Sequence, residues 1–286
     1  MTMPPPQAHQ APQQPQQGWE GSPGPYASPI PVRTPGLGDA LASEWTKIRS
    51  VRSTMWTLGV MIVLLIGIGL LVAFVVSLAD EPLDDTPVLS LGFFGVLLGS
   101  ICVITLGVLT IASEYSTGMI RTTLTACPSR ARMLTAKSIV FFLLAFTITT
   151  VTTGIVGVLQ TALLDGATPD TGLWMRSTLG IGLYVATLGL LSLAVGALVR
   201  HSAGAITVMI AVVLLPLVLA IFMFSPTLAS VQQFLFEYSI PNQIGAMYDV
   251  SVTTSGPSGW EPLGVIACVT AVAMAGAFAS LDRRDV

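Results

Sequence analysis

Long apolar runs dominate the hydrophobic pattern of the chain and determine its predicted architecture. A helix needs about 20 apolar residues to cross a hydrocarbon core of roughly 30 Å. Six segments reach that length, approximately Trp56–Leu78, Val88–Ala112, Ser138–Leu164, Met175–Val199, Gly204–Phe224 and Pro262–Leu281. None shows the strict alternation of a spanning strand, and only helices satisfy their own backbone in lipid. The pattern predicts an all-α polytopic membrane protein with six transmembrane helices.

Composition agrees with this architecture. Mean hydropathy is +0.78, and only 9% of the residues are charged, where a soluble domain carries roughly 25%. Residues 1–36 form a separate Pro- and Gln-rich segment without the basic and apolar regions of a signal peptide. Because repeated proline prevents helix formation, we expect residues 1–36 to be a disordered cytoplasmic tail, followed by one membrane domain at 37–286.

The basic residues indicate how the bundle is oriented. Lys and Arg are retained in cytoplasmic loops. If the N-terminus is inside, eleven of the twelve Lys and Arg residues fall on the cytoplasmic side, and only Arg176 falls outside. The pattern predicts that both termini and the segment between the second and third spans are cytoplasmic.

An amphipathic segment precedes the first span. Its apolar residues recur at helical spacing on one face, namely Leu41, Trp45, Ile48, Val51 and Met55. Lys47, Arg49 and Arg52 lie away from that face. We therefore expect an interfacial helix, marked by these three residues and Trp45, with its apolar side in the headgroup boundary and its basic side in water. Such a helix would either anchor the chain at the membrane surface or transmit force to the bundle.

The predicted spans lack the charges that ion-driven transport needs. A charge at the bilayer centre costs roughly 2.5–3.5 kcal/mol and is usually kept for function. The ionisable residues nearest the spans are Glu114, Lys137, Arg176 and Arg200, and all lie at span ends, where snorkelling keeps a charge in the interface. The sequence argues against an ion-coupled transporter and against a channel with a charged filter.

Enzymatic and metal sites are not indicated. The GPSG at Gly256–Gly259 matches the pattern around the serine of rhomboid-type proteases, but His201 is predicted on the opposite side of the membrane from Ser258. The three cysteines lack metal-ligand spacing. The chain also lacks a GxxxxGK[ST] loop, so ATP would have to be bound by another protein. We expect no catalytic residue, no metal and no enzyme activity.

Residues 113–137 form a charged segment between the second and third spans. Met119 to Cys127 show the modest apolar face of a short helix that ends at Pro128. Ser129 can then cap the helix that leads into the third span. On charge alone, the segment is typical of an ordinary positive-inside loop.

The order of residues in this segment resembles that of a known family. The loop after the second span of ABC-2 type transport permeases is similar at Glu114, Gly118, Met119, Ile120, Leu124, Pro128, Arg130, Arg132, Leu134 and Lys137. The resemblance is closest to actinobacterial members, in which the forms of Glu44–Leu58 and Leu281–Val286 are also familiar. Met119 departs from the pattern, since Thr is commoner there, and Arg130 matches within a two-arginine cluster. The likeness covers about Asp39 to Val286.

The resemblance implies the membrane subunit of an ATP-binding cassette transporter in a bacterial plasma membrane, and we expect this subunit to be part of an exporter. It implies that a separate ATPase docks on a coupling loop with the residues Glu114, Gly118, Met119, Ile120, Arg121, Leu124, Pro128 and Arg130. ATP would be bound by that partner, so the chain itself needs no cofactor. The other expected partners are a second six-span copy and membrane lipids, and not nucleic acid. A non-transporting membrane subunit that senses or sequesters a ligand is the alternative.

Two features outside that loop predict further structure. The GVLLG at Gly95–Gly99 is a GxxxG motif, which predicts close helix packing either within the chain or between two copies. The last outer loop, from about Ser225 to Glu261, has an apolar and aromatic middle. We expect it to form short helices packed on or dipping into the outer face, because such a loop is poorly suited to water.

Overall fold

A computed structural model describes residues 36–79, 87–126, 129–164, 169–251, 253 and 255–283. The predicted tail, except for its last residue, lies outside these residues. So do Pro128 and the side chains of Arg121 and Leu124, three of the residues predicted for the coupling loop.

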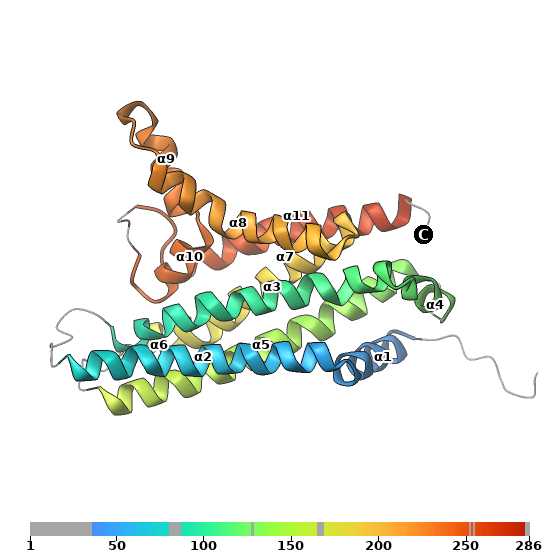
Figure 1. The fold of residues 1–286 in the computed structure, drawn as a ribbon, viewed down its shortest axis with the longest axis horizontal. Helices are drawn as coiled ribbons and strands as arrows, with labels where there is room; N and C mark the ends of the chain where they lie inside the picture. The colour runs from blue at the N-terminus through green and yellow to red at the C-terminus, as the bar shows by residue number, and fades with distance from the viewer. Residues whose placement is uncertain are drawn as a thin grey trace, which may run out of the picture. The chain divides into compact units, whose positions relative to one another are not determined.

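Six helical segments among the described residues are long and apolar enough to cross a membrane, which confirms the predicted number. Figure 1 shows them running side by side, with the short helices α1 and α4 at one end of the bundle and α6 and α10 at the other. The six segments are Arg52–Leu78, Val88–Ser116, Arg130–Leu163, Thr171–Val199, Ser202–Phe222 and Glu261–Arg283. None of the described residues forms a strand. The part of the chain that the structure describes is therefore all-α, as the sequence predicts.

The elements follow the chain in a simple order. They are α1 (Leu37–Ser50), α2 (Arg52–Leu78), the 3₁₀ turn η1 (Val88–Gly92), α3 (Phe93–Ser116), α4 (Met119–Ala126), α5 (Arg130–Leu163), α6 (Thr171–Met175), the π-helical segment η2 (Arg176–Gly180), α7 (Ile181–Val199), α8 (Ser202–Phe222), the 3₁₀ turn η3 (Pro226–Leu228), α9 (Ala229–Glu237), α10 (Ile240–Met247) and α11 (Glu261–Arg283). The helix of the third span begins at Arg130, two turns before its apolar run, so part of α5 lies beyond the most apolar zone.

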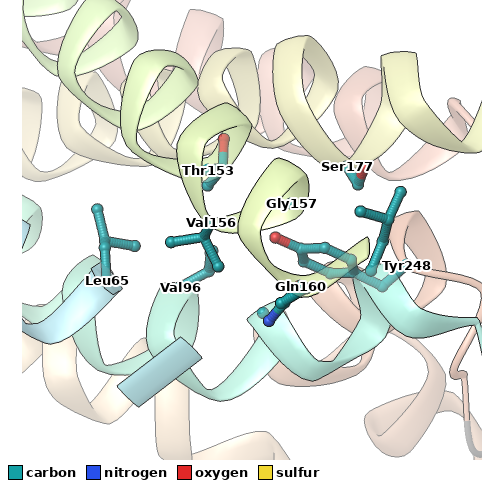
Figure 2. A pocket seen from close by; sticks show the side chains of 10 residues that line it. Leu65, Val96, Thr153, Val156, Gly157, Gln160, Ser177 and Tyr248 are labelled. Atoms are coloured by element: carbon teal, nitrogen blue, oxygen red, sulfur yellow. The ribbon is translucent and has the colours of Figure 1, made fainter. Parts of the chain in front are cut away.

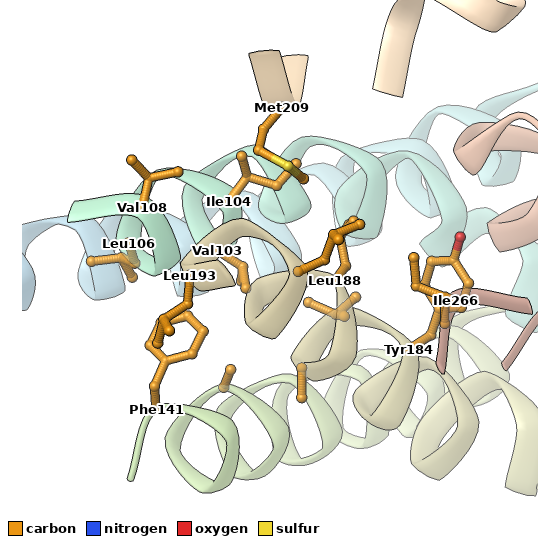
Figure 3. Close-up of a cluster of buried hydrophobic side chains, with 14 of the residues drawn as sticks. Val103, Ile104, Leu106, Val108, Phe141, Tyr184, Leu188, Leu193, Met209 and Ile266 are labelled. Carbon is orange, nitrogen blue, oxygen red and sulfur yellow. The ribbon is translucent and has the colours of Figure 1, made fainter. Parts of the chain in front are cut away.

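Helix α7 lies at the centre of the bundle. Its span has the largest buried share of the six, 72% of its apolar window, and α3, α5 and α11 all pack against it. Figure 3 shows Val103 and Ile104 from α3, Phe141 from α5 and Leu188 from α7 meeting in this core. A side chain at Gly189 of α7 would approach the Phe141 ring to 2.6 Å. The close approach of α7 to its neighbours thus depends on glycine.

The GxxxG motif of α3 is used within the chain. A Cβ atom at Gly95 would lie 2.8 Å from the carbonyl oxygen of Leu65 in α2, and one at Gly99 would lie 3.1 Å from the Leu65 side chain. Small residues let the two helix backbones approach closely. Of the two predicted uses of this motif, the structure shows the intramolecular one.

Three spans present largely apolar outer faces. Only 22% of the apolar window of α2, 22% of that of α8 and 17% of that of α11 is buried inside the bundle. Their exposed side chains include Val63, Phe74, Leu215, Val218 and Val272. Such faces suit the hydrocarbon of a membrane, because lipid tails are as apolar as these side chains.

The predicted short helices of the last outer loop are present as α9 and α10. Every residue of α10 is buried, whereas α9 is largely exposed and projects from the bundle in Figure 1. Arg176, in η2, makes two 2.7 Å hydrogen bonds to the Asp249 carboxylate just after α10. This bidentate pair joins the end of α10 to the start of the α7 span.

A small cavity lies near this end of the bundle, between α2, α3 and α5. Figure 2 shows Leu65, Val156, Gln160 and Tyr248 in its lining. Its volume is about 10 Å³, which is close to the space that one water molecule needs.

Candidate functional site

Four charged side chains from three helices meet at the end of the bundle that carries α4. Lys137 of α5 places its Nζ 2.7 Å from Glu44 Oε2 and 2.9 Å from Glu114 Oε1. Lys47 places its Nζ 2.7 Å from Glu44 Oε1 and 3.0 Å from Glu114 Oε1. Glu44 and Lys47 belong to α1, and Glu114 belongs to α3. We call these four residues the ion cluster.

Three of the four side chains of the ion cluster are almost completely shielded from solvent. The side chain of Lys137 is 1% exposed, those of Glu114 and Glu44 are 4% and 5% exposed, and that of Lys47 is 30% exposed. Two carboxylates and two ammonium groups balance in charge, and buried charges are tolerated when they are paired and hydrogen-bonded. The expectation that Lys137 snorkels to the interface was wrong, because its ammonium group turns into the bundle.

Electrostatic pairing controls the ionisation of Glu44 and Lys47, the two residues that α1 contributes to the ion cluster. Burial alone would raise the pKa of Glu44, but Lys137 and Lys47 outweigh burial and hold it below its ordinary value. Burial alone would lower the pKa of Lys47, but its hydrogen bonds to Glu44 and Glu114 raise it. Both groups therefore stay charged at neutral pH.

Helix α1 is present, but it faces the bundle differently from the prediction. Trp45, Arg49 and Arg52 are exposed, as expected for an interfacial helix. Lys47, predicted on the water side, instead joins the ion cluster. The predicted continuous apolar face is interrupted, because Val51 is extended between α1 and α2. Whether α1 lies in a membrane interface is still a prediction.

Helix α4 confirms the predicted short helix of the charged segment. Gly118 precedes it with φ +72, a left-handed conformation that glycine adopts without strain. Ile120 is buried and holds α4 against the bundle, while Met119 is exposed. The hydroxyl of Thr122 donates to the Met119 carbonyl oxygen over 2.8 Å.

The N-terminus of α5 is fixed by a cap and by a contact with the last span. Ser129 Oγ accepts from the Arg132 backbone amide over 3.3 Å, which confirms the predicted cap. Arg130 Nη1 donates to the Leu281 carbonyl oxygen of α11 over 2.6 Å. Arg130, a predicted coupling residue, therefore joins two spans within the chain.

A surface groove runs between α1, α4 and α5. It has a volume of about 360 Å³. Its lining residues are Ala40, Ser43, Glu44, Lys47, Met119, Thr122, Thr123, Met133 and Ala136. The groove reaches the ion cluster at Glu44 and Lys47, so an object seated in it would contact α4 and α1 together.

Sequence reasoning missed Glu44 and Lys137 as members of the site. Glu44 lies one helical turn before Lys47, a spacing that favours an ion pair on one face. Lys137 lies directly before an apolar run in which no charge follows. Both signals are weak alone, because neither indicates that α1, α3 and α5 converge.

His201 and Ser258 have separate structural roles. His201 Nδ1 accepts from the Gly204 amide over 3.1 Å and caps α8. The Ser258 amide donates to Glu261 Oε2 over 2.9 Å at the start of α11. In Figure 1, α8 begins at the α4 end of the bundle and α11 begins at the opposite end. The pair cannot form a catalytic dyad.

Arg200, at the end of α7, packs on Tyr115 of α3. Its guanidinium carbon is 5.0 Å from the centre of the Tyr115 ring, a cation–π contact.

Among the described residues, no group of three or more His, Cys, Asp or Glu side chains could hold a metal ion. No family model matches the chain, and no curated protein matches it.

Proposed function

We propose that this chain is the membrane-spanning subunit of an ATP-binding cassette transporter of the ABC-2 type, an exporter driven by a separate ATPase. The observation that carries the proposal is the placement of α4. This eight-residue helix joins the second and third spans at one end of the bundle and shares a groove with α1. A docked partner that moves a short helix held between two spans can move both spans with it.

The contacts of this region divide the predicted coupling residues into two groups. Glu114, Ile120 and Arg130 contact other parts of the chain. Met119, which was predicted, and Thr122, which was not, line the groove, where a partner can reach them. We therefore infer that the ATPase contacts α4 through Met119 and Thr122. Glu114 and Arg130 would pass its movement to α1, α5 and α11.

The proposed transporter needs partners that supply what the chain lacks. ATP is bound by the ATPase, because the sequence contains no phosphate-binding loop. We expect the path of the substrate to lie between two six-span copies, because the resemblance implies a second copy of the chain. The protein would lie in a bacterial plasma membrane with α4 and both termini on the cytoplasmic side.

Affinity purification from native membranes tests the proposal. An ATP-binding protein should purify with the wild-type chain. It should be lost from Thr122→Glu, which places a charge on α4. Thr46→Glu is the matched control, since it adds the same charge on the exposed surface of α1, outside the groove lining. If no ATPase accompanies any correctly inserted form, the alternative of a non-transporting membrane subunit is favoured.

A further inference from the structure

A second hollow lies between α1, α2 and α3 and shares Glu44, Lys47 and Met119 with the groove. It has a volume of about 190 Å³, and Glu44, Lys47, Glu114 and Lys137 form its charged end. Its lining includes Val51 and Ser53, at the start of α2. If α2 spans a membrane, this cleft opens at the level of the lipid headgroups.

Three of the five hydroxyl side chains that line the cleft, those of Thr57, Thr110 and Ser113, present hydrogen-bond acceptors. Thr57 Oγ1 donates to the Ser53 carbonyl oxygen over 2.9 Å, and Thr110 Oγ1 donates to that of Leu106 over 2.6 Å. Ser113 Oγ donates in the same way to its own helix. A hydroxyl has one proton and two lone pairs. With its proton used by the helix, each of these groups has only lone pairs left for a ligand.

Glu114 adds a charged acceptor to the cleft. Its Oε1 accepts from both Lys47 and Lys137, but its Oε2 has no hydrogen-bond partner among the described residues. Glu114 is only 3% exposed. A buried carboxylate oxygen without a donor is costly, so the site favours a ligand that brings N–H groups to Oε2.

Lys47 gives the mouth of the cleft the opposite charge. Its side chain is 30% exposed and uses two of its three N–H groups on Glu44 and Glu114. The remaining wall is apolar and contains Ile48, Val51, Leu106 and Leu109. The cleft therefore combines an apolar side with a charged end, at which the Lys137 ammonium is buried, Glu114 Oε2 lacks a donor and Lys47 reaches the surface.

We propose that this cleft binds the headgroup of an aminophospholipid. The primary ammonium donates to Glu114 Oε2 and to the hydroxyl oxygens of Thr110 and Thr57, the phosphate lies near Lys47, and an acyl chain follows the apolar wall. A choline headgroup has no N–H to donate, and a glycerol headgroup has no positive charge. The proposal depends on insertion of the bundle in a membrane and not on the ATPase.

Native mass spectrometry of the full chain tests the site with phosphatidylethanolamine, phosphatidylcholine and phosphatidylglycerol of identical acyl chains. The wild type should retain phosphatidylethanolamine in preference to the other two. Glu114→Gln should weaken this binding about tenfold or more, because hydrogen bonds to charged groups are among the stronger ones. Thr110→Val and Thr57→Val should also weaken this binding. Because they leave the ion cluster untouched, they test the site even if Glu114→Gln does not fold.

Thr105→Val is the matched control. Thr105 lies on α3 and bonds its own helix over 2.8 Å as Thr110 does, but it lies outside the cleft lining. It should bind phosphatidylethanolamine as the wild type does. Equal retention of all three lipids by the wild type, or unchanged binding in Thr110→Val and Thr57→Val, would overturn the proposal.

A competition experiment separates a lipid headgroup from a free amine. Octylammonium carries the ammonium and an apolar tail but no phosphate, so it should displace phosphatidylethanolamine only weakly. Strong, Glu114-dependent binding of octylammonium without any binding of phosphatidylethanolamine would contradict the lipid assignment and identify the cleft as a site for free alkylamines.

Discussion

Lys137 and Glu44 are 93 residues apart in the sequence, yet their side chains meet 2.7 Å apart inside the end of the bundle. This ion pair joins α1 to α5, and Glu114 joins both helices to α3. The segment before the first span is thereby fixed to the two spans that flank α4. A force on α1 would therefore act directly on α3 and α5.

Removing the positive charge of Lys137 should strongly destabilise the fold. Lys137→Met leaves two buried carboxylates with Lys47 alone, and breaking a buried pair costs about 3–5 kcal/mol. Thermal unfolding in detergent measures this loss. Arg49→Met, on the exposed side of α1, should change stability by no more than about 0.5 kcal/mol.

A double variant distinguishes electrostatic pairing from packing. The double variant Glu44→Gln with Lys137→Met should lose less stability than the sum of the losses in the two single variants. The reason is that the second change removes a charge that the first left unpaired. Strict additivity of the two losses would contradict direct pairing.

The ion cluster should make stability independent of pH around neutrality. The pKa of Glu44 is lowered from 4.5, so its contribution is present above pH 4.5 and disappears as the pH falls through the lowered value. The pKa of Lys47 is raised from 10.5, so its contribution is present below pH 10.5 and disappears as the pH rises through the raised value. The difference in Tm between wild type and Glu44→Gln should therefore be constant near pH 7 and shrink in acid. A difference that grew on acidification would contradict this assignment.

Much of the fold is predictable from the sequence, because each span carries its own signal. The six apolar runs, the short helix at Met119 and the cap at Ser129 are local patterns, and the structure contains all of them. The ion cluster is not local. Burial of Lys137 depends on the meeting of three helices, and a lysine at a span end has the same local pattern whether it snorkels or turns inward.

The turn before α4 should tolerate only residues that accept a left-handed backbone. Gly118 has φ +72 and open space around it, so the constraint is conformational rather than steric. Gly118→Val should cost about 1–2 kcal/mol and shift α4, which reduces ATPase binding while membrane insertion persists. Gly118→Asn should retain binding, because Asn adopts this conformation far more readily. Equal ATPase binding by the two variants would show that the turn does not position α4.

Cysteine labelling tests the predicted orientation. In a background without the three native cysteines, a membrane-impermeant reagent applied outside should label position 255 and leave positions 49 and 201 unlabelled. The expectation follows from the distribution of Lys and Arg. Labelling at 49 or 201 in intact cells would reverse the orientation and remove α4 from the cytoplasm.

The central claim, that an ATPase docks on α4, is tested most directly by crosslinking in native membranes. A photoreactive amino acid at Thr122 lies on the exposed surface of α4, within the groove that α4 shares with α1. It should crosslink to an ATP-binding protein, and the same probe at Thr46, outside the groove, should crosslink far less. Crosslinks from position 122 only to lipid or to this chain itself would contradict the account.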